Sequence, residues 1–351
     1  MIIPKIQKKS KNPLINLIGV IVAFVVLVIL CRTGVVSTYI SGILMTICIS
    51  IIMATSLNIA TGFLGQIALG HCGFMAIGAY TSALITKAMA NSDILVGAGM
   101  PNFFRFLIAI LIGGALAAVF GMLVGIPALR LKGDYLAIIT LGFGEIIRVV
   151  IQNLKFCGGN GLSNGAAGQA LVGISRISNI YVVYWITVIC VFLMFCFVRS
   201  RYGRALMAIR EDDVSSGATG LNVTYYKVLA FTFSAFFAGI AGGIFAHYIG
   251  SLSIGNFTFM KSVEYVIMVV FGGMGSLTGS IVAGGILSAL PEALRQFAMY
   301  RMLVYSIALV VVVIFKPTGL FGTKEFSLTN VLRRLTGRGN AEEVKDGGQN
   351  E

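Results

Sequence analysis

Long apolar segments, each separated from the next by a shorter polar one, run through most of the chain. About 20 apolar residues in a helix cross the hydrocarbon core of a bilayer, and only helices and closed barrels satisfy their backbone there. Only 11% of the residues are charged, against about 25% in soluble domains. The sequence therefore predicts an all-α, polytopic bundle of transmembrane helices that contacts lipid.

The apolar segments predict about ten crossings. They are residues 14–31, 39–60, a segment ending near 87, 106–126, 135–151, 180–198, 228–249, two segments within 262–290, and 302–315. The sequence FGGMGSLTGS interrupts 262–290, so this stretch is either two crossings or one crossing with a re-entrant half-helix. The predicted total is therefore eight to ten.

The distribution of basic residues predicts the orientation. Residues 1–13 form a basic tail, 14–316 the transmembrane domain, and 317–351 a polar tail. Most lysines and arginines fall in these tails and in the polar segment 199–227, and cytoplasmic segments are the ones enriched in Lys and Arg. Both tails and segment 199–227 are thus predicted to be cytoplasmic. Topology explains the net charge of +13, and no aromatic-interleaved basic patch indicates a nucleic-acid partner.

Segment 199–227 is the longest polar interruption between apolar segments. Its acidic cluster predicts a short helix over about 214–219, with Asp213 as the N-cap and Gly220 as the left-handed residue after the helix. The helix carries small residues, so another protein can pack closely on it: Ser215, Ser216, Gly217 and Ala218. A docking surface is one interpretation, and an ordinary solvated loop whose caps prevent fraying is the other.

An acidic residue, two small residues and a later glycine resemble the cytoplasmic coupling motif of ABC-importer permeases, whose short helix sits in a groove on an ATPase subunit. The flanking sequences RYGRALMAIREDD and NVTYYKVLAF are similar to branched-chain amino acid permeases of the LivM type. So are GQIALGHCGFMAIGAY, GDYLAIITLGFGEIIR and VVFGGMGSLTGSIVAG, and the matches cover most of residues 55–322. That family usually has two alanines where this chain has Ser215 and Ser216, which keep the size and add hydroxyls.

The resemblance implies a permease subunit in a bacterial cell membrane that carries branched-chain or related amino acids. A related second permease would complete the path, two ABC ATPase subunits would dock beneath, and an external binding protein would deliver the substrate. ATP would bind to those partner subunits, because this chain has no GxxxxGK[ST] phosphate loop; neither an enzyme activity nor a cofactor of its own is expected. The implied coupling residues are Arg210, Glu211, Asp212, Asp213, Ser215, Ser216, Gly217 and Gly220.

Two further sets of residues are candidates for the translocation path. Glu145 and Arg148 lie one helical turn apart, and a charged pair inside a membrane segment either lines a wet path, meets a partner, or is neutralised near a helix end. Two Gly-x-x-Gly pairs, one in each half of the chain, indicate an internal repeat or close helix packing. Those glycines are Gly62, Gly65, Gly272 and Gly275.

The remaining polar residues in apolar segments indicate packing. His71 and His247, the only histidines, have no acidic or cysteine partner at metal-ligand spacing, so each is predicted to be a hydrogen-bonded contact between helices. The six cysteines include no CxxC pair, and neither a metal site nor a disulfide framework is predicted.

Two alternative functions remain open at this point. The same kind of ABC permease can carry urea or a short amide, because selectivity resides largely in the binding protein. An ion-coupled secondary transporter that works through Glu145 would instead need no ATPase.

Overall fold

A computed structural model describes residues 38–91, 102–131, 133–154, 171–172, 174, 176 and 179–294. The predicted crossings 14–31 and 302–315 and both tails lie outside these residues. The chain divides into two units, and the elements below belong to the unit of residues 42–323, apart from the first turn of α2.

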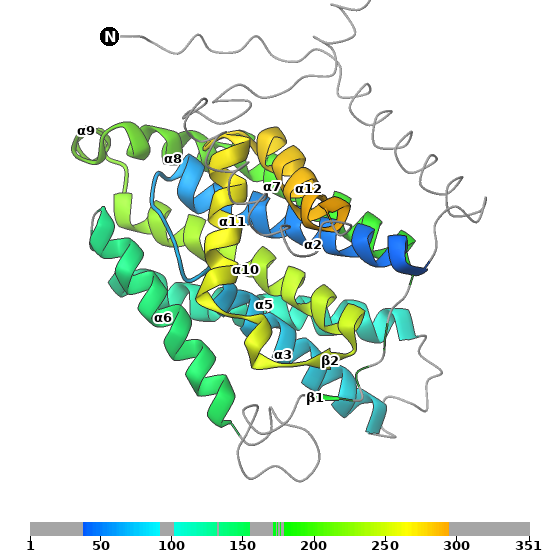
Figure 1. The fold of residues 1–351 in the computed structure, drawn as a ribbon. Coiled ribbons are helices and arrows are strands. Elements are labelled where there is room, and N and C mark those ends of the chain that lie inside the picture. The colour runs from blue at the N-terminus through cyan, green and yellow to red at the C-terminus, as the bar shows by residue number, and fades with distance from the viewer. Residues whose placement is uncertain are drawn as a thin grey trace, which may run out of the picture. The chain divides into compact units, whose positions relative to one another are not determined.

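The described residues are almost entirely helical, as predicted (Figure 1). The longer helices are α2 (Thr38–Asn58), α3 (His71–Asn91), α5 (Asn102–Ala128), α6 (Asp134–Asn153), α7 (Ile180–Arg199), α10 (Val223–Ile249), α11 (Phe259–Gly272) and α12 (Leu277–Ala293). The shorter ones are the π-helix η1 (Ile59–Phe63), α8 (Arg201–Glu211), α9 (Asp213–Ala218) and the 3-10 turn η4 (Ile254–Asn256). Two-residue strands, β1 (Leu171–Val172) and β2 (Ser251–Leu252), pair antiparallel and are the one departure from the all-α expectation in this part of the chain.

Six helical segments among the described residues are long and apolar enough to cross a membrane. They are Tyr39–Phe63, Phe103–Ala128, Tyr135–Asn153, Ile180–Arg199, Val223–Ile249 and Ile254–Gly272. Helix α12 is apolar but shorter, and the predicted interruption of 262–290 is confirmed as the break between α11 and α12. The total number of crossings and the side on which the termini lie stay predictions.

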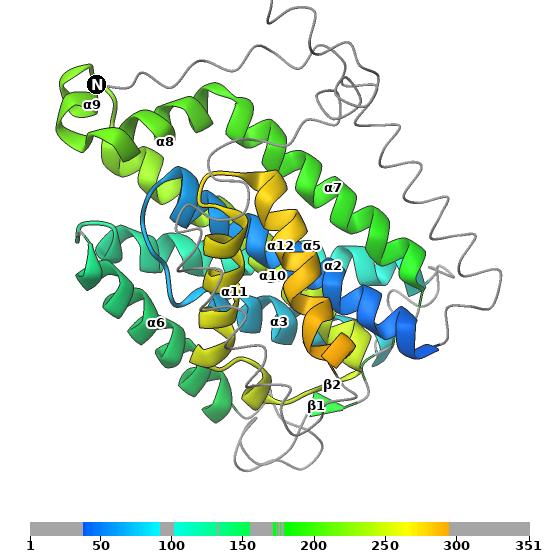
Figure 2. The same cartoon turned by 45° about the horizontal axis from the view of Figure 1, so that its top comes forward.

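Helices α3, α5 and α10 pack against one another at the centre of this unit (Figures 1 and 2). They approach closely because glycines meet at the crossings: a β-carbon on Gly78 would lie 2.1 Å from the carbonyl oxygen of Gly239. A β-carbon on Gly239 would in turn lie 2.9 Å from Cα of Gly114. Small residues at helix crossings allow such backbone contact in membrane proteins.

Hydrogen bonds between buried polar side chains also join the central helices. Nε2 of His71 in α3 lies 2.9 Å from Oγ of Ser56 in α2, and Nε2 of His247 in α10 lies 2.9 Å from Oγ1 of Thr86 in α3. All four residues are buried. The prediction that the histidines are hydrogen-bonded contacts between helices is therefore confirmed.

Helix α6 is the least buried of the six membrane-length segments. Its outward residues are mostly large and apolar: Tyr135, Ile138, Ile146, Val149 and Val150. In a bilayer this surface requires lipid or a second protein to cover it.

Candidate functional site: the docking segment and the glycine breaks

Segment 199–227 is more helical than predicted. Helix α7 continues to Arg199, α8 and α9 fill most of the segment, and α10 begins at Val223. We call α8 and α9 together the docking segment; they lie between two helices of membrane-spanning length (Figure 1).

The sequence analysis missed α8, although a signal was present. Ala205, Leu206 and Ile209 recur within about one helical turn and are all buried, while the residues between them are exposed. The side chain of Ser200 caps the start of the helix by accepting a hydrogen bond from the amide of Tyr202 at 3.1 Å. Helix α8 is therefore amphipathic, with its apolar face against the bundle.

The predicted helix in the acidic cluster is present, but its predicted cap is wrong. The N-cap is Asp212, whose Oδ1 accepts a hydrogen bond from the amide of Val214 at 2.9 Å. Asp212 has the extended backbone that an N-cap requires, with φ −156° and ψ 113°, whereas Asp213 is already the first helical residue. Gly220 follows the helix with φ +86°, so its predicted left-handed conformation is confirmed.

Helix α9 presents most of its surface to the outside. Ser216 is the one residue of α9 that is buried, and Val214 is 75% exposed. The outward residues, which we call the docking face, are Val214, Ser215, Gly217 and Ala218. The side chains of this face are short and carry no charge. Glu211 and Asp212 are exposed beside it.

An ion pair ties α9 to the membrane-length helix α10. Nζ of Lys227 lies 2.7 Å from Oδ2 of Asp213, with the lysine side chain 8% exposed and the aspartate 26%. Among the described residues the Lys261–Glu264 pair has the same 2.7 Å separation but is far more exposed, at 49% and 41%. Removing one partner of a shielded ion pair leaves an uncompensated charge, so loss of Lys227 is expected to disturb its helix more than loss of Lys261 would.

Replacing Lys227 with Met is expected to loosen α9, because the ion pair between Lys227 and Asp213 is lost while the methionine keeps the packed stem. Amide hydrogen exchange over 213–220 should accelerate by about threefold or more, as for the loss of a partly buried pair. The matched control is Lys261→Met, which removes a pair of equal length that is exposed to water. Equal exchange over 213–220 in the Lys227→Met variant and the parent would show that the pair does not hold α9.

The Glu145–Arg148 pair is formed as predicted. Nε of Arg148 lies 2.6 Å from Oε2 of Glu145, past the middle of α6, and the two side chains are 27% and 33% exposed, respectively. Charged groups inside a membrane are unfavourable unless they are paired or wet, and here the two charges neutralise each other. A role of this pair in the path or at an interface with a partner stays a prediction.

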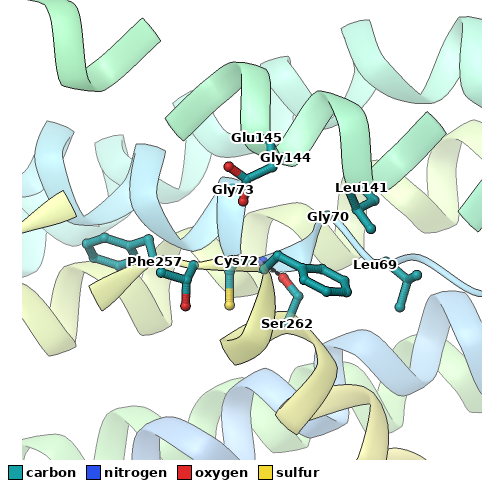
Figure 3. Close-up of a pocket in the computed structure, with 11 residues that line it drawn as sticks. Leu69, Gly70, Cys72, Gly73, Leu141, Gly144, Glu145, Phe257 and Ser262 are labelled. Atoms are coloured by element: carbon teal, nitrogen blue, oxygen red, sulfur yellow. Dashed lines mark hydrogen bonds between the residues drawn. The ribbon is translucent and has the colours of Figure 1, made fainter. Parts of the chain in front are cut away.

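Glu145 borders a small open recess of about 10 Å³, which has room for about one water molecule (Figure 3). The start of α3, the middle of α6 and the chain leading into α11 form its walls. The lining residues are Leu69, Gly70, Cys72, Gly73, Leu141, Gly144, Glu145, Phe257, Thr258, Phe259 and Ser262. Two hydrogen bonds join its lining to neighbouring helices: the amide of Cys72 donates to Oγ of Ser262 at 3.0 Å, and the amide of Leu69 donates to Oγ1 of Thr140 at 3.1 Å.

The four predicted path glycines mark two breaks in the helices. Gly62 lies in η1 and Gly65 follows it with φ +77°; Gly272 ends α11, and Gly275 lies in the break before α12 with φ +91°. The breaks meet in space, because a β-carbon on Gly62 would lie 2.3 Å from the amide nitrogen of Gly275. We call this meeting point the glycine junction. An internal repeat and a role in the path stay predictions.

The described residues form several membrane-length helices around a core that glycine contacts and buried hydrogen bonds hold together. A short helical segment connects two of these helices. These features define a polytopic α-helical membrane protein. The model of the family described as "Branched-chain amino acid transport system / permease component" matches residues 39–314. The chain belongs to this family.

Individual relatives agree with this assignment. The chain is 36% identical over 272 residues to the high-affinity branched-chain amino acid transport system permease protein LivM of Salmonella typhimurium, and equally to that of Escherichia coli. Each alignment covers 70% of this chain and 61% of the relative, so the chain spans less than two thirds of these LivM proteins. It is also 28% identical over 266 residues to the S. typhimurium permease protein LivH, covering 71% of this chain and 83% of that protein. No solved structure matches significantly.

Proposed function

We propose that this chain is a membrane subunit of an ABC importer, in a bacterial cell membrane, and forms part of the translocation path for branched-chain or related amino acids. The observation that carries the proposal is the docking face. A short, capped helix with small outward side chains is tethered by Lys227 to a membrane-length helix, in a member of a permease family.

The partners follow from the same reasoning. The chain resembles both LivM and LivH proteins, which supports assembly with a related second permease. That permease would cover the exposed side of α6 and give the Glu145–Arg148 pair a surrounding other than lipid. Two ABC ATPase subunits would receive α9, and an external binding protein would deliver the substrate. ATP would bind to the ATPases, since this chain has no phosphate-loop sequence.

The mechanism needs no covalent chemistry from this chain. Closure of the ATPases around ATP would shift α9, and the shift would pass into the helices on either side of it. Packed helices rearrange by hinge and shear between discrete arrangements, so the path would alternate between outward and inward access.

Reconstituted vesicles test the proposal. With the second permease, both ATPases and the binding protein, uptake of labelled leucine should require internal ATP and should cease when the phosphate-loop lysine of the ATPase is replaced. Labelled urea and a short amide are competing substrates in the same assay. Uptake driven by a proton or sodium gradient without any ATPase would establish an ion-coupled transporter instead.

A further inference from the structure

One side chain of the docking segment reaches both helix breaks. Arg210 lies in the last turn of α8, and its Nη1 donates a hydrogen bond to the carbonyl oxygen of Gly62 in η1. A β-carbon on Gly65 would lie 2.9 Å from Cγ of Arg210, and one on Gly275 would lie 3.0 Å from its Nη1. Although Arg210 is exposed overall, its guanidinium thus lies on the glycine junction.

A buried asparagine joins the two breaks from the inside. Asn58, the last residue of α2, is fully buried, and its Nδ2 donates to the carbonyl oxygen of Ser276 and to Oγ of Ser280, each at 2.8 Å. Its Oδ1 accepts from the amide of Gly275 at 3.0 Å. Both donors and the acceptor of the side-chain amide are therefore used, which fixes the two breaks relative to each other.

The junction has no spare room. A β-carbon on Gly62 would lie 1.7 Å from Oδ1 of Asn58, so even a methyl group would displace the asparagine or the second break. A close-packed site of this kind passes a displacement on to its neighbours, because close-packed interiors transmit strain. Interrupted helices also offer the few residues that can absorb a change of backbone angle.

We propose that Arg210 is a positioning residue that transmits movement of α9 to the glycine junction. Arg210 moves with α9 because it lies three residues before the start of that helix. It is also linked to the junction, because it donates a hydrogen bond to the Gly62 carbonyl. The planar guanidinium presents several donors in fixed directions, so it controls orientation as well as distance. The inference rests on the proposed docking of an ATPase at α9, and it assigns to Arg210 the step between docking and the change in the bundle.

The test is the ratio of leucine transported to ATP hydrolysed by the complete complex in vesicles. Arg210→Ala should leave co-purification of the ATPases within about twofold of the parent, as for an exposed substitution. The transport ratio should fall by about tenfold, a typical size for coupling between two sites. Arg204→Ala is the matched control, because Arg204 is also an exposed arginine of α8 but bonds to the carbonyl of Arg199 at the end of α7 and not to the glycine junction.

Two results would overturn the inference. A parent-like transport ratio in Arg210→Ala would mean that the contact carries no movement, and loss of the ATPases from that variant would mean that Arg210 only holds α9 for docking. If Arg210→Ala does not accumulate, Arg210→Gln replaces it. The ratio of leucine transported to ATP hydrolysed should then fall by about threefold or more. An unchanged ratio in Arg210→Gln would contradict the inference. Failure of the proposed function is distinguishable, because the unaltered complex would then show no ATP-dependent uptake.

Discussion

Alanine at Gly78 is expected to prevent this chain from accumulating as a folded protein. The added methyl carbon would lie 2.1 Å from the carbonyl oxygen and 2.3 Å from Cα of Gly239, which are backbone atoms of another central helix. Side chains can rotate away from an intruding atom, but here α3 and α10 must separate. Overpacking a core commonly destabilises by about 1–3 kcal/mol, and separating two backbones belongs at or above the upper end of that range.

The matched control for Gly78→Ala is Gly142→Ala, the same chemical change in α6. A β-carbon on Gly142 would meet nothing within 4 Å, and alanine is favoured over glycine in a helix by about 1 kcal/mol. The amount of monodisperse protein in detergent and its melting temperature provide the measurement. Gly78→Ala should lose the monodisperse protein, and Gly142→Ala should match or exceed the parent. Equal stability of the two variants would show that α3 and α10 do not approach as closely as described.

Aspartate at Val214 is expected to abolish ATP-driven uptake without unfolding the chain. Val214 is 75% exposed, so the substitution removes almost no packing within the chain. On the docking face it would bury a carboxylate in the proposed contact with the ATPase, where an unpaired charge is strongly unfavourable. Loss of the contact should lower uptake by about a hundredfold, corresponding to about 3 kcal/mol.

Met260→Asp is the control for Val214→Asp. Met260 is 68% exposed but lies at the start of α11, at the end of that helix away from α9 (Figure 1). Uptake by the two variants, normalised to the amount of complex in the vesicles, separates a docking defect from a general effect of a new carboxylate. Normal uptake with Val214→Asp would mean that the docking face contacts no ATPase.

Periodicity and local chemistry were enough to predict the features that depend on neighbouring residues. The apolar segments predicted the helices of the bundle because length and hydropathy decide what can cross a bilayer. Gly220 and the Glu145–Arg148 pair were predicted because a helix end and a one-turn spacing are local features.

Contacts between distant parts of the chain could not be predicted in this way. Asp213 pairs with Lys227 in α10, while the neighbouring Asp212 caps α9. The hydrogen bond from Arg210 joins it to Gly62, 148 residues earlier, and no spacing rule connects them. Local sequence indicated the interruption at Gly272 and Gly275, but not that it meets a second break at Gly62 and Gly65.

Site-specific photocrosslinking tests the central claim most directly. A photoreactive residue at position 214 of this chain, in membranes that contain the full transporter, should crosslink to an ATPase subunit, whereas the same residue at position 260 should not. Crosslinking at 214 only to lipid or to the second permease, in a complex that takes up leucine with ATP, would contradict docking through α9.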